Sequence, residues 1–188
     1  MPALTRREQR DRTRQHLLET TVTCLVEHGY AGTTTQRIQR LAGVSRGALL
    51  HHFRSKADLL AAAVGHIAEL QLADIRAATP NTRQARLAAV RSAMSGPVFQ
   101  AGLELWMAAR TDEALRTALL PSQREIGRAV RELLAAEFAG HDPRTARTAH
   151  ESLLMLLRGL ALTSVLRDEP ELADAVLALW LDRVLPPP

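Results

Sequence analysis

Residues 33–53 read TTTQRIQRLAGVSRGALLHHF. Apolar residues recur at helical spacing on both sides of Gly43, which predicts short helices over 35–42 and 46–52. Gly43 tolerates the left-handed backbone that a tight turn between two helices needs, and Ser45 is a good cap for the second helix. The stretch is therefore predicted to form a helix-turn-helix.

The second of these helices has the chemistry of a helix that reads DNA. Its leading face carries small side chains, so it can enter a major groove, and Arg46 can make the bidentate contact to guanine. The hydroxyls of Thr33, Thr34 and Thr35 gather at the start of the helix over 35–42, where free N–H groups favour a phosphate. Lys56 begins the following helix and is expected at a backbone phosphate. The predicted DNA contacts are Thr34, Thr35, Gln36, Ser45, Arg46, Gly47, Ala48, His51, His52 and Lys56.

Other roles for these side chains stay open from the sequence alone. The threonines can simply cap a helix, and Arg46 can be a solvated charge. A metal site at His51 and His52 is not expected, because consecutive helical residues point about 100° apart and no carboxylate or thiol accompanies them.

Helical periodicity continues through the rest of the chain, without an alternating strand pattern. The first helix is expected to end at Gly29, a break is expected at 79–81, and Pro121 is expected to break or kink its helix. The fold class is all-α. Helices are expected over 6–28, 55–78, 82–95, 97–110, 112–138, 143–167 and 170–185.

The charge is divided unevenly along the 188 residues. Residues 1–56 carry 10 basic and 4 acidic side chains, whereas residues 57–188 carry 14 and 16. An N-terminal third that is basic suggests contact with a polyanion, and the arginines of residues 6–14 form a basic arm beside the helix-turn-helix.

Several classes of protein are not expected. There is no nucleophile elbow, phosphate loop or paired catalytic carboxylates, so neither an enzyme nor a cofactor is predicted. The single cysteine, Cys24, lies in an apolar helical pattern and is expected to be a buried, inert thiol. No signal peptide is recognisable, and the most apolar stretch, 153–166, is short for a bilayer, so a soluble cytoplasmic protein is expected.

Together these residues resemble the signature of the TetR family of bacterial regulators. The matching positions are Gly29–Thr35, Ile38, Ala42–Leu49, His52-Phe53 and Ser55–Leu60. With the preceding helix, the resemblance covers about 50 residues without a gap.

The resemblance implies a three-helix DNA-binding domain over residues 1–56 and a helical dimerisation and effector-binding domain over 57–188. It also implies a repressor that a small molecule releases from its DNA operator. One position departs from the pattern, because family members usually carry a phosphate-binding tyrosine where this chain has Leu50. Either that contact is lost or a neighbour such as His51 supplies it. The alternative function is therefore a helical protein that binds a ligand or a partner and has weak or no DNA binding.

The C-terminal sequence also supports a homodimer. Its last two helices are apolar on more than one face, which a symmetry mate would cover, unless the helices are buried within one chain. The predicted interface residues are Leu153, Leu157, Leu160, Val165, Val176, Leu177, Trp180 and Leu181.

A pocket for the effector is expected among large apolar and nearby polar side chains, although core filling is their default role. Arg158 could hold an acidic ligand or form a salt bridge at the dimer seam. The candidate pocket residues are Met94, Phe99, Leu103, Trp106, Met107, His150, Met155 and Arg158.

Overall fold

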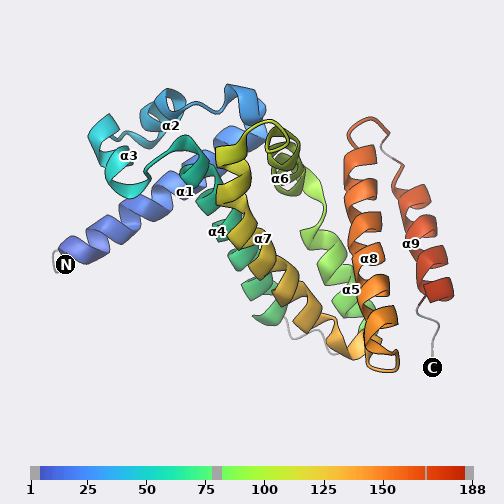
Figure 1. Cartoon of the computed structure of the whole chain (residues 1–188). Helices are drawn as coiled ribbons and strands as arrows, with labels where there is room; N and C mark the ends of the chain where they lie inside the picture. Colours follow the sequence, from blue (N-terminus) through green and yellow to red (C-terminus); the bar gives the residue numbers. More distant parts are fainter. Residues whose placement is uncertain (1–4, 78–81, 168, 185–188) are drawn as a thin grey trace. The chain divides into compact units, whose positions relative to one another are not determined.

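The computed structural model describes residues 5–77, 82–167 and 169–184, and all regular elements in these ranges are helices (Figure 1). The predicted all-α fold is confirmed. The helices are α1 (Arg6–Gly32), α2 (Thr35–Ala42), α3 (Arg46–His52), α4 (Lys56–Ala77), α5 (Arg83–Ala93), α6 (Gly96–Ala108), α7 (Glu113–Leu133), the 3₁₀ helix η1 (Ala135–Phe138), α8 (Pro143–Thr163) and α9 (Pro170–Val184).

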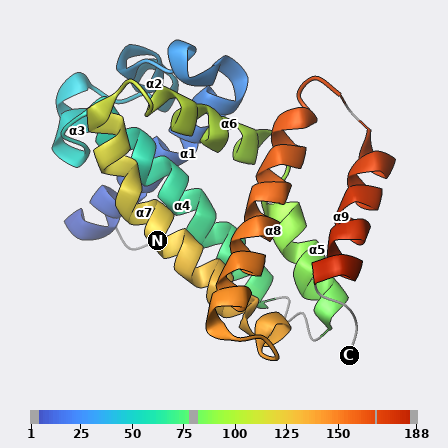
Figure 2. The same ribbon diagram turned by 45° about the vertical axis from the view of Figure 1, so that its right-hand side comes forward.

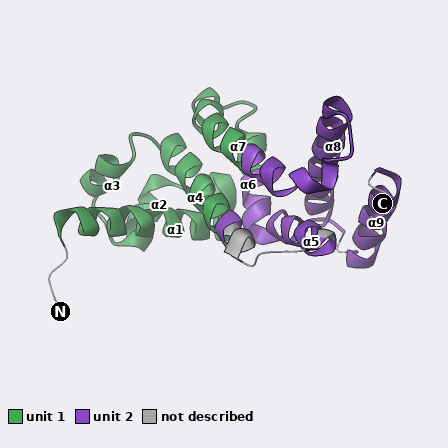
Figure 3. Ribbon diagram, turned by 90° about the horizontal axis from the view of Figure 1, so that it is seen from below, with its two compact units in different colours: residues 1–70, 104–126 green, residues 71–103, 127–188 purple. Residues whose placement is uncertain are grey.

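The chain divides into two compact units, which Figure 3 shows in green and purple. Unit 1 consists of residues 1–70 and 104–126, and unit 2 consists of 71–103 and 127–188. Most of α4 and parts of α6 and α7 belong to the same compact unit as α1–α3, and the division of function at residue 56 stays a prediction.

Unit 1 is built on a core beneath the first three helices. α1 starts with a capping box, in which Thr5 accepts the N–H of Glu8 and the Glu8 carboxylate accepts the N–H of Thr5. One face of each of α1, α2, α3 and α4 then contributes buried apolar side chains. Cys24 is buried among them as a free thiol, as expected. The core residues are Leu17, Leu18, Cys24, Ile38, Ala42, Leu49, Phe53, Leu59 and Ala63.

Unit 2 ends in a helical hairpin. Asp142 caps α8 by accepting the N–H groups of Arg144 and Thr145, and Pro143 occupies the first helical turn, where its missing N–H costs nothing. α9 runs back alongside α8, as Figures 1 and 2 both show. The inner side of α8 is buried at Leu153 and Leu157.

Several helix boundaries differ from the predictions, and α8, for example, ends at Thr163 and not at 167. α7 ends at Leu133, and η1 replaces the last part of the helix expected to reach 138. Pro121 lies inside α7 and does not end it. α1 extends to Gly32, but the non-helical backbone of Gly29 interrupts it at the residue where the sequence predicts its end. The break expected at 79–81 lies outside the described residues.

Gly29 and Tyr30 join the end of α1 to the corner between α6 and α7 within unit 1. Gly29 has φ 63° and ψ −177°, a conformation essentially restricted to glycine. This turn lets the Tyr30 N–H donate to Glu104 Oε1 at 2.8 Å, and the Tyr30 hydroxyl donates to Asp112 Oδ2 at 3.0 Å. A backbone hydrogen bond from Leu115 and the one from Tyr30 hold the pKa of Asp112 below its ordinary value.

Replacing Gly29 with alanine should destabilise the chain by about 1–3 kcal/mol, because the backbone conformation becomes strained. A Cβ there would also lie 2.8 Å from Glu104 Oε1. Urea unfolding followed by circular dichroism measures the change. The control is Gly102→Ala inside α6, where a Cβ meets no atom within 4 Å and should be neutral or stabilising. Equal stability of Gly29→Ala and the parent chain would contradict the account of this turn.

Candidate nucleic-acid interface

The turn between α2 and α3 has the geometry of a helix-turn-helix. Gly43 is left-handed, with φ 64° and ψ 30°, and Val44 donates its N–H to the carbonyl of Gln39 at 3.1 Å. The Ser45 hydroxyl accepts the N–H of Ala48 at 3.1 Å and so starts α3. These contacts confirm the predicted helix-turn-helix.

α3 divides its side chains between the core and solvent. Leu49 and Phe53 are buried against the core of unit 1 and fix the orientation of the helix. Arg46, Gly47 and His51 are exposed. Gly47 adds no side chain to this surface, so a partner molecule can approach the backbone closely. Arg46, Gly47 and His51 therefore lie on the outer surface of α3, where a major groove can reach them, whereas Ala48 and His52 are half-buried.

The start of α2 is also accessible. Thr34 caps the helix, and its hydroxyl accepts the N–H of Arg37 at 3.2 Å. Thr34 and Gln36 are exposed, and Thr35 is half-buried. These residues stand where the free N–H groups of the first turn favour an anion.

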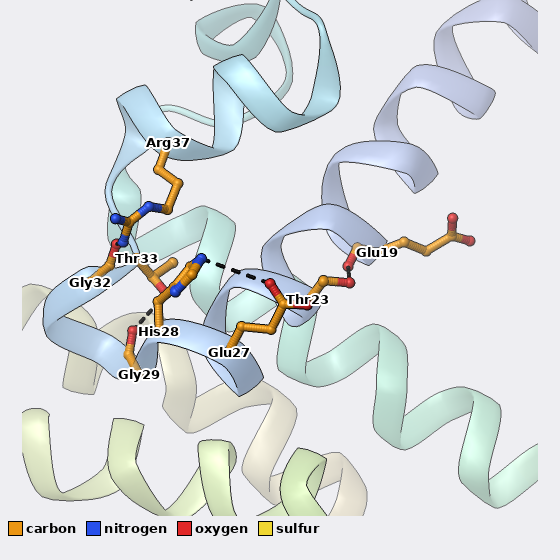
Figure 4. A network of polar contacts seen from close by, with 8 residues as sticks. All are labelled: Glu19, Thr23, Glu27, His28, Gly29, Gly32, Thr33 and Arg37. Atoms are coloured by element: carbon orange, nitrogen blue, oxygen red, sulfur yellow. Dashed lines mark hydrogen bonds and ion pairs between the residues drawn. The ribbon is translucent and has the colours of Figure 1, made fainter.

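Thr33 does not belong to this surface. It is completely buried, and its hydroxyl donates to the carbonyl of Gly29 at 2.7 Å. The expectation that its hydroxyl meets a phosphate is therefore wrong, because that hydroxyl satisfies the end of α1. Arg37 from α2 donates to the carbonyl of Gly32 and so ties α2 to the last turn of α1 (Figure 4).

Lys56 makes intramolecular contacts that sequence reasoning missed. Its Nζ donates to the Tyr30 carbonyl at 3.3 Å and lies 4.3 Å from the centre of the Tyr30 ring. Burial lowers the pKa of the Lys56 ammonium, and Asp112 opposes that shift. The ammonium thus stabilises the end of α1, and a phosphate contact by Lys56 stays a prediction.

His51 and His52 form an edge-on pair with ring centres 5.5 Å apart. His51 is exposed, whereas His52 is half-buried and its Nδ1 is buried without a hydrogen-bond partner. Burial lowers the pKa of His52, and His51, Arg10 and Arg14 lower it further. Among the described residues, no group of three or more histidine, cysteine, aspartate or glutamate side chains could hold a metal.

The basic arm at the start of α1 is exposed to solvent. Arg14 also contacts the end of α3, because its guanidinium lies 5.3 Å from the centre of the Phe53 ring. The arm therefore stands on a helix that packs against α3. Its exposed arginines are Arg6, Arg7, Arg10, Arg12 and Arg14.

The residues predicted to form a pocket are not gathered around one described cavity. A cavity of about 640 Å³ in unit 2 is lined by Met94, and another of about 540 Å³ is lined by His150. Met107 and Met155 are exposed, so their side chains face solvent. Trp106 and Met107 belong to unit 1, whereas the six others, Met94, Phe99, Leu103, His150, Met155 and Arg158, belong to unit 2.

The residues predicted for the dimer interface fall into two groups. Leu153, Leu157 and Leu177 are buried within the chain, so they add no surface for a partner and their assignment to the interface needs correction. Periodicity could not separate the inner side of these helices from the outer one. Val165 is exposed, and Leu160, Val176, Trp180 and Leu181 are partly exposed.

Comparison with known proteins identifies the family. The model of bacterial regulatory proteins of the tetR family matches residues 17–63, which include α2 and α3. The transcriptional regulator BetI of Burkholderia mallei is 34% identical over 204 residues, covering 100% of this chain and 99% of that protein. The chain belongs to the TetR family. The BetI protein of Paraburkholderia phymatum is similarly related, at 33% identity over 98% of this chain and 95% of that protein.

Solved structures agree with this assignment. The multidrug binding protein EbrR, crystallised with imidazole, has a TM-score of 0.66 and 27% identity, with 93% of this chain and 96% of that one covered. A transcriptional regulator from Rhodococcus sp. Rha1 shares the fold, with a TM-score of 0.74 at 22% identity over 92% and 95% of the chains. This TetR-family chain is a DNA-binding transcription regulator. No helix in the described ranges has the length and apolar character that a membrane span requires.

His150 should make the stability of the chain depend on pH. It is 3% exposed, its ring lies edge-on to Phe138, and burial lowers its pKa below the ordinary 6.5. Below about pH 6.5 the unfolded chain binds a proton that the folded chain does not, so stability falls as the pH decreases.

Urea midpoints at pH 7.5 and 5.5 measure this effect. The loss on acidification should be smaller in His150→Gln than in the parent chain, while His52 contributes a loss of the same sign in both. Retention of the helical circular dichroism at pH 7.5 shows that the variant folds. An equal loss in the two proteins would contradict the assignment to His150.

Proposed function

We propose that this chain is a homodimeric repressor whose residues 1–56 bind an operator and whose residues 57–188 dimerise and bind a small-molecule effector. The observation that carries the proposal is the exposed face of α3, with Arg46, Gly47 and His51, in a chain of the TetR family. Arg46 would read guanine, and the N-terminus of α2 would bind a phosphate. A dimer would insert two such helices into successive major grooves of a partly palindromic operator.

Exposed apolar side chains on α8 and α9 support the homodimer. On α8, Met155 and Leu162 are exposed at a seven-residue spacing, which places them on one face of the helix. Leu172 and Leu179 repeat that spacing on α9. Because α8 and α9 lie side by side, their exposed apolar residues can pack against the same pair in a second copy.

The effector would bind within residues 57–188. The cavity of about 640 Å³ is lined from α5, α6, α8 and α9, and Met94, Leu157 and Leu160 give it apolar walls. The structural neighbour EbrR, a multidrug binding protein, has been crystallised in complexes with imidazole, ethidium and proflavin. A ligand releases DNA only if it binds the DNA-incompetent arrangement more tightly than the competent one.

The experiment that tests the proposal is selection of duplexes from a random library, followed by binding measurements with Arg46→Ala. The variant should lose about 1–3 kcal/mol on the selected duplex and discriminate less well at the base pair that Arg46 contacts. Arg144→Ala on α8 removes an exposed arginine from unit 2 and should bind like the parent chain. Enrichment of no duplex, or unchanged binding by Arg46→Ala, would contradict the proposal.

The homodimer is tested by placing a charge on the exposed face of α8. Leu162→Glu should convert the dimer to a monomer in sedimentation velocity, because an unpaired carboxylate would be buried at the interface. Leu120→Glu makes the same change at an exposed leucine of α7 in unit 1 and should leave the dimer intact. A parent chain that sediments as a monomer, or a Leu162→Glu variant that stays dimeric, would overturn this assignment.

A further inference from the structure

Leu50 is an exposed apolar side chain in the middle of the reading helix. It is 49% exposed, whereas its neighbour Leu49 is 1% exposed and packs in the core. Leu50 is therefore not needed to pack α3 against the core. Leu50 follows Arg46 by four residues, which places the two on the same face of the helix.

The surroundings of Leu50 indicate what it can contact. Arg46, Gly47 and His51 are exposed beside it, so in the DNA complex that the proposed function requires Leu50 would face the major groove. A leucine has no hydrogen-bond donor or acceptor, so it gains nothing from a phosphate or from the polar base edges. The one apolar group that a base pair presents in the major groove is the C5-methyl of thymine.

We propose that Leu50 contacts a thymine methyl and makes the chain select a thymine at one position of each operator half-site. The inference rests on the proposed function, since it needs α3 in the groove. Four residues of helix rise about 6 Å, so this thymine lies within about two base pairs of the guanine that Arg46 reads. Leu50 is thus a specificity-determining residue, and its contact with DNA is apolar.

Deoxyuridine substitution tests this contact, because uracil differs from thymine only by lacking the C5-methyl. Duplexes selected by the parent chain from a random library are resynthesised with deoxyuridine at single thymine positions, and affinities are measured at fixed salt concentration. At one position in each half-site the parent chain should bind the uracil duplex about fourfold more weakly, which corresponds to one buried methyl group. Leu50→Ala should bind the thymine and uracil duplexes equally.

Leu41→Ala is the matched control. Leu41 is 53% exposed in α2, outside the reading helix, so its truncation should leave the fourfold preference for thymine intact. The inference is overturned if the parent chain tolerates uracil at all positions, or if Leu50→Ala keeps the preference, and in both cases the proposed function still stands. If no duplex is selected, the proposed function itself fails and this inference fails with it.

Discussion

The positive φ of Gly29 is the constraint on which the DNA-binding surface depends. It turns the chain so that the Tyr30 N–H reaches Glu104 and the Tyr30 hydroxyl reaches Asp112. The carbonyl of Tyr30 also accepts a hydrogen bond from the Lys56 ammonium, which lies over the Tyr30 ring. One tyrosine therefore connects the end of α1, the start of α4 and the corner between α6 and α7. These contacts are among those that join residues 104–126 to the helix-turn-helix in one compact unit.

Near this junction, polar side chains donate hydrogen bonds to backbone carbonyl groups at the end of α1. The packing of apolar side chains holds α3 on the core. Thr33 and Arg37 bond to carbonyl groups in the last turns of α1, and Leu49 and Phe53 fill the core below α3. The exposed side chains on the outer face of α3 are therefore not needed to hold the helix on the core. This division fits a helix that carries recognition on one side and stability on the other, with Arg46 supplying the polar part of recognition.

Much of this arrangement could be predicted from the sequence, because local rules decide it. Gly43 and Ser45 mark the turn and the cap of α3, and the predicted bounds of α2 and α3 agree with the structure. The role of Lys56 could not be predicted, because its partner Tyr30 is 26 residues away and only the tertiary fold brings the two together. The Thr33 hydroxyl has a local partner, the carbonyl of Gly29 four residues earlier, but the sequence does not show which way that hydroxyl points. Periodicity also identifies apolar helices without saying which side faces the core. Leu153 is an example, because periodicity predicts it at a dimer interface and the structure buries it within the chain.

Hydrogen–deuterium exchange with a selected duplex shows directly whether α3 enters the DNA complex. If α3 reads DNA, exchange should slow in residues 34–36 and 46–52 on adding the selected duplex, with a weaker effect from an unrelated duplex of equal length. Slower exchange confined to residues beyond 57, or none at all with a duplex that binds, would contradict the claim that α3 is the reading helix.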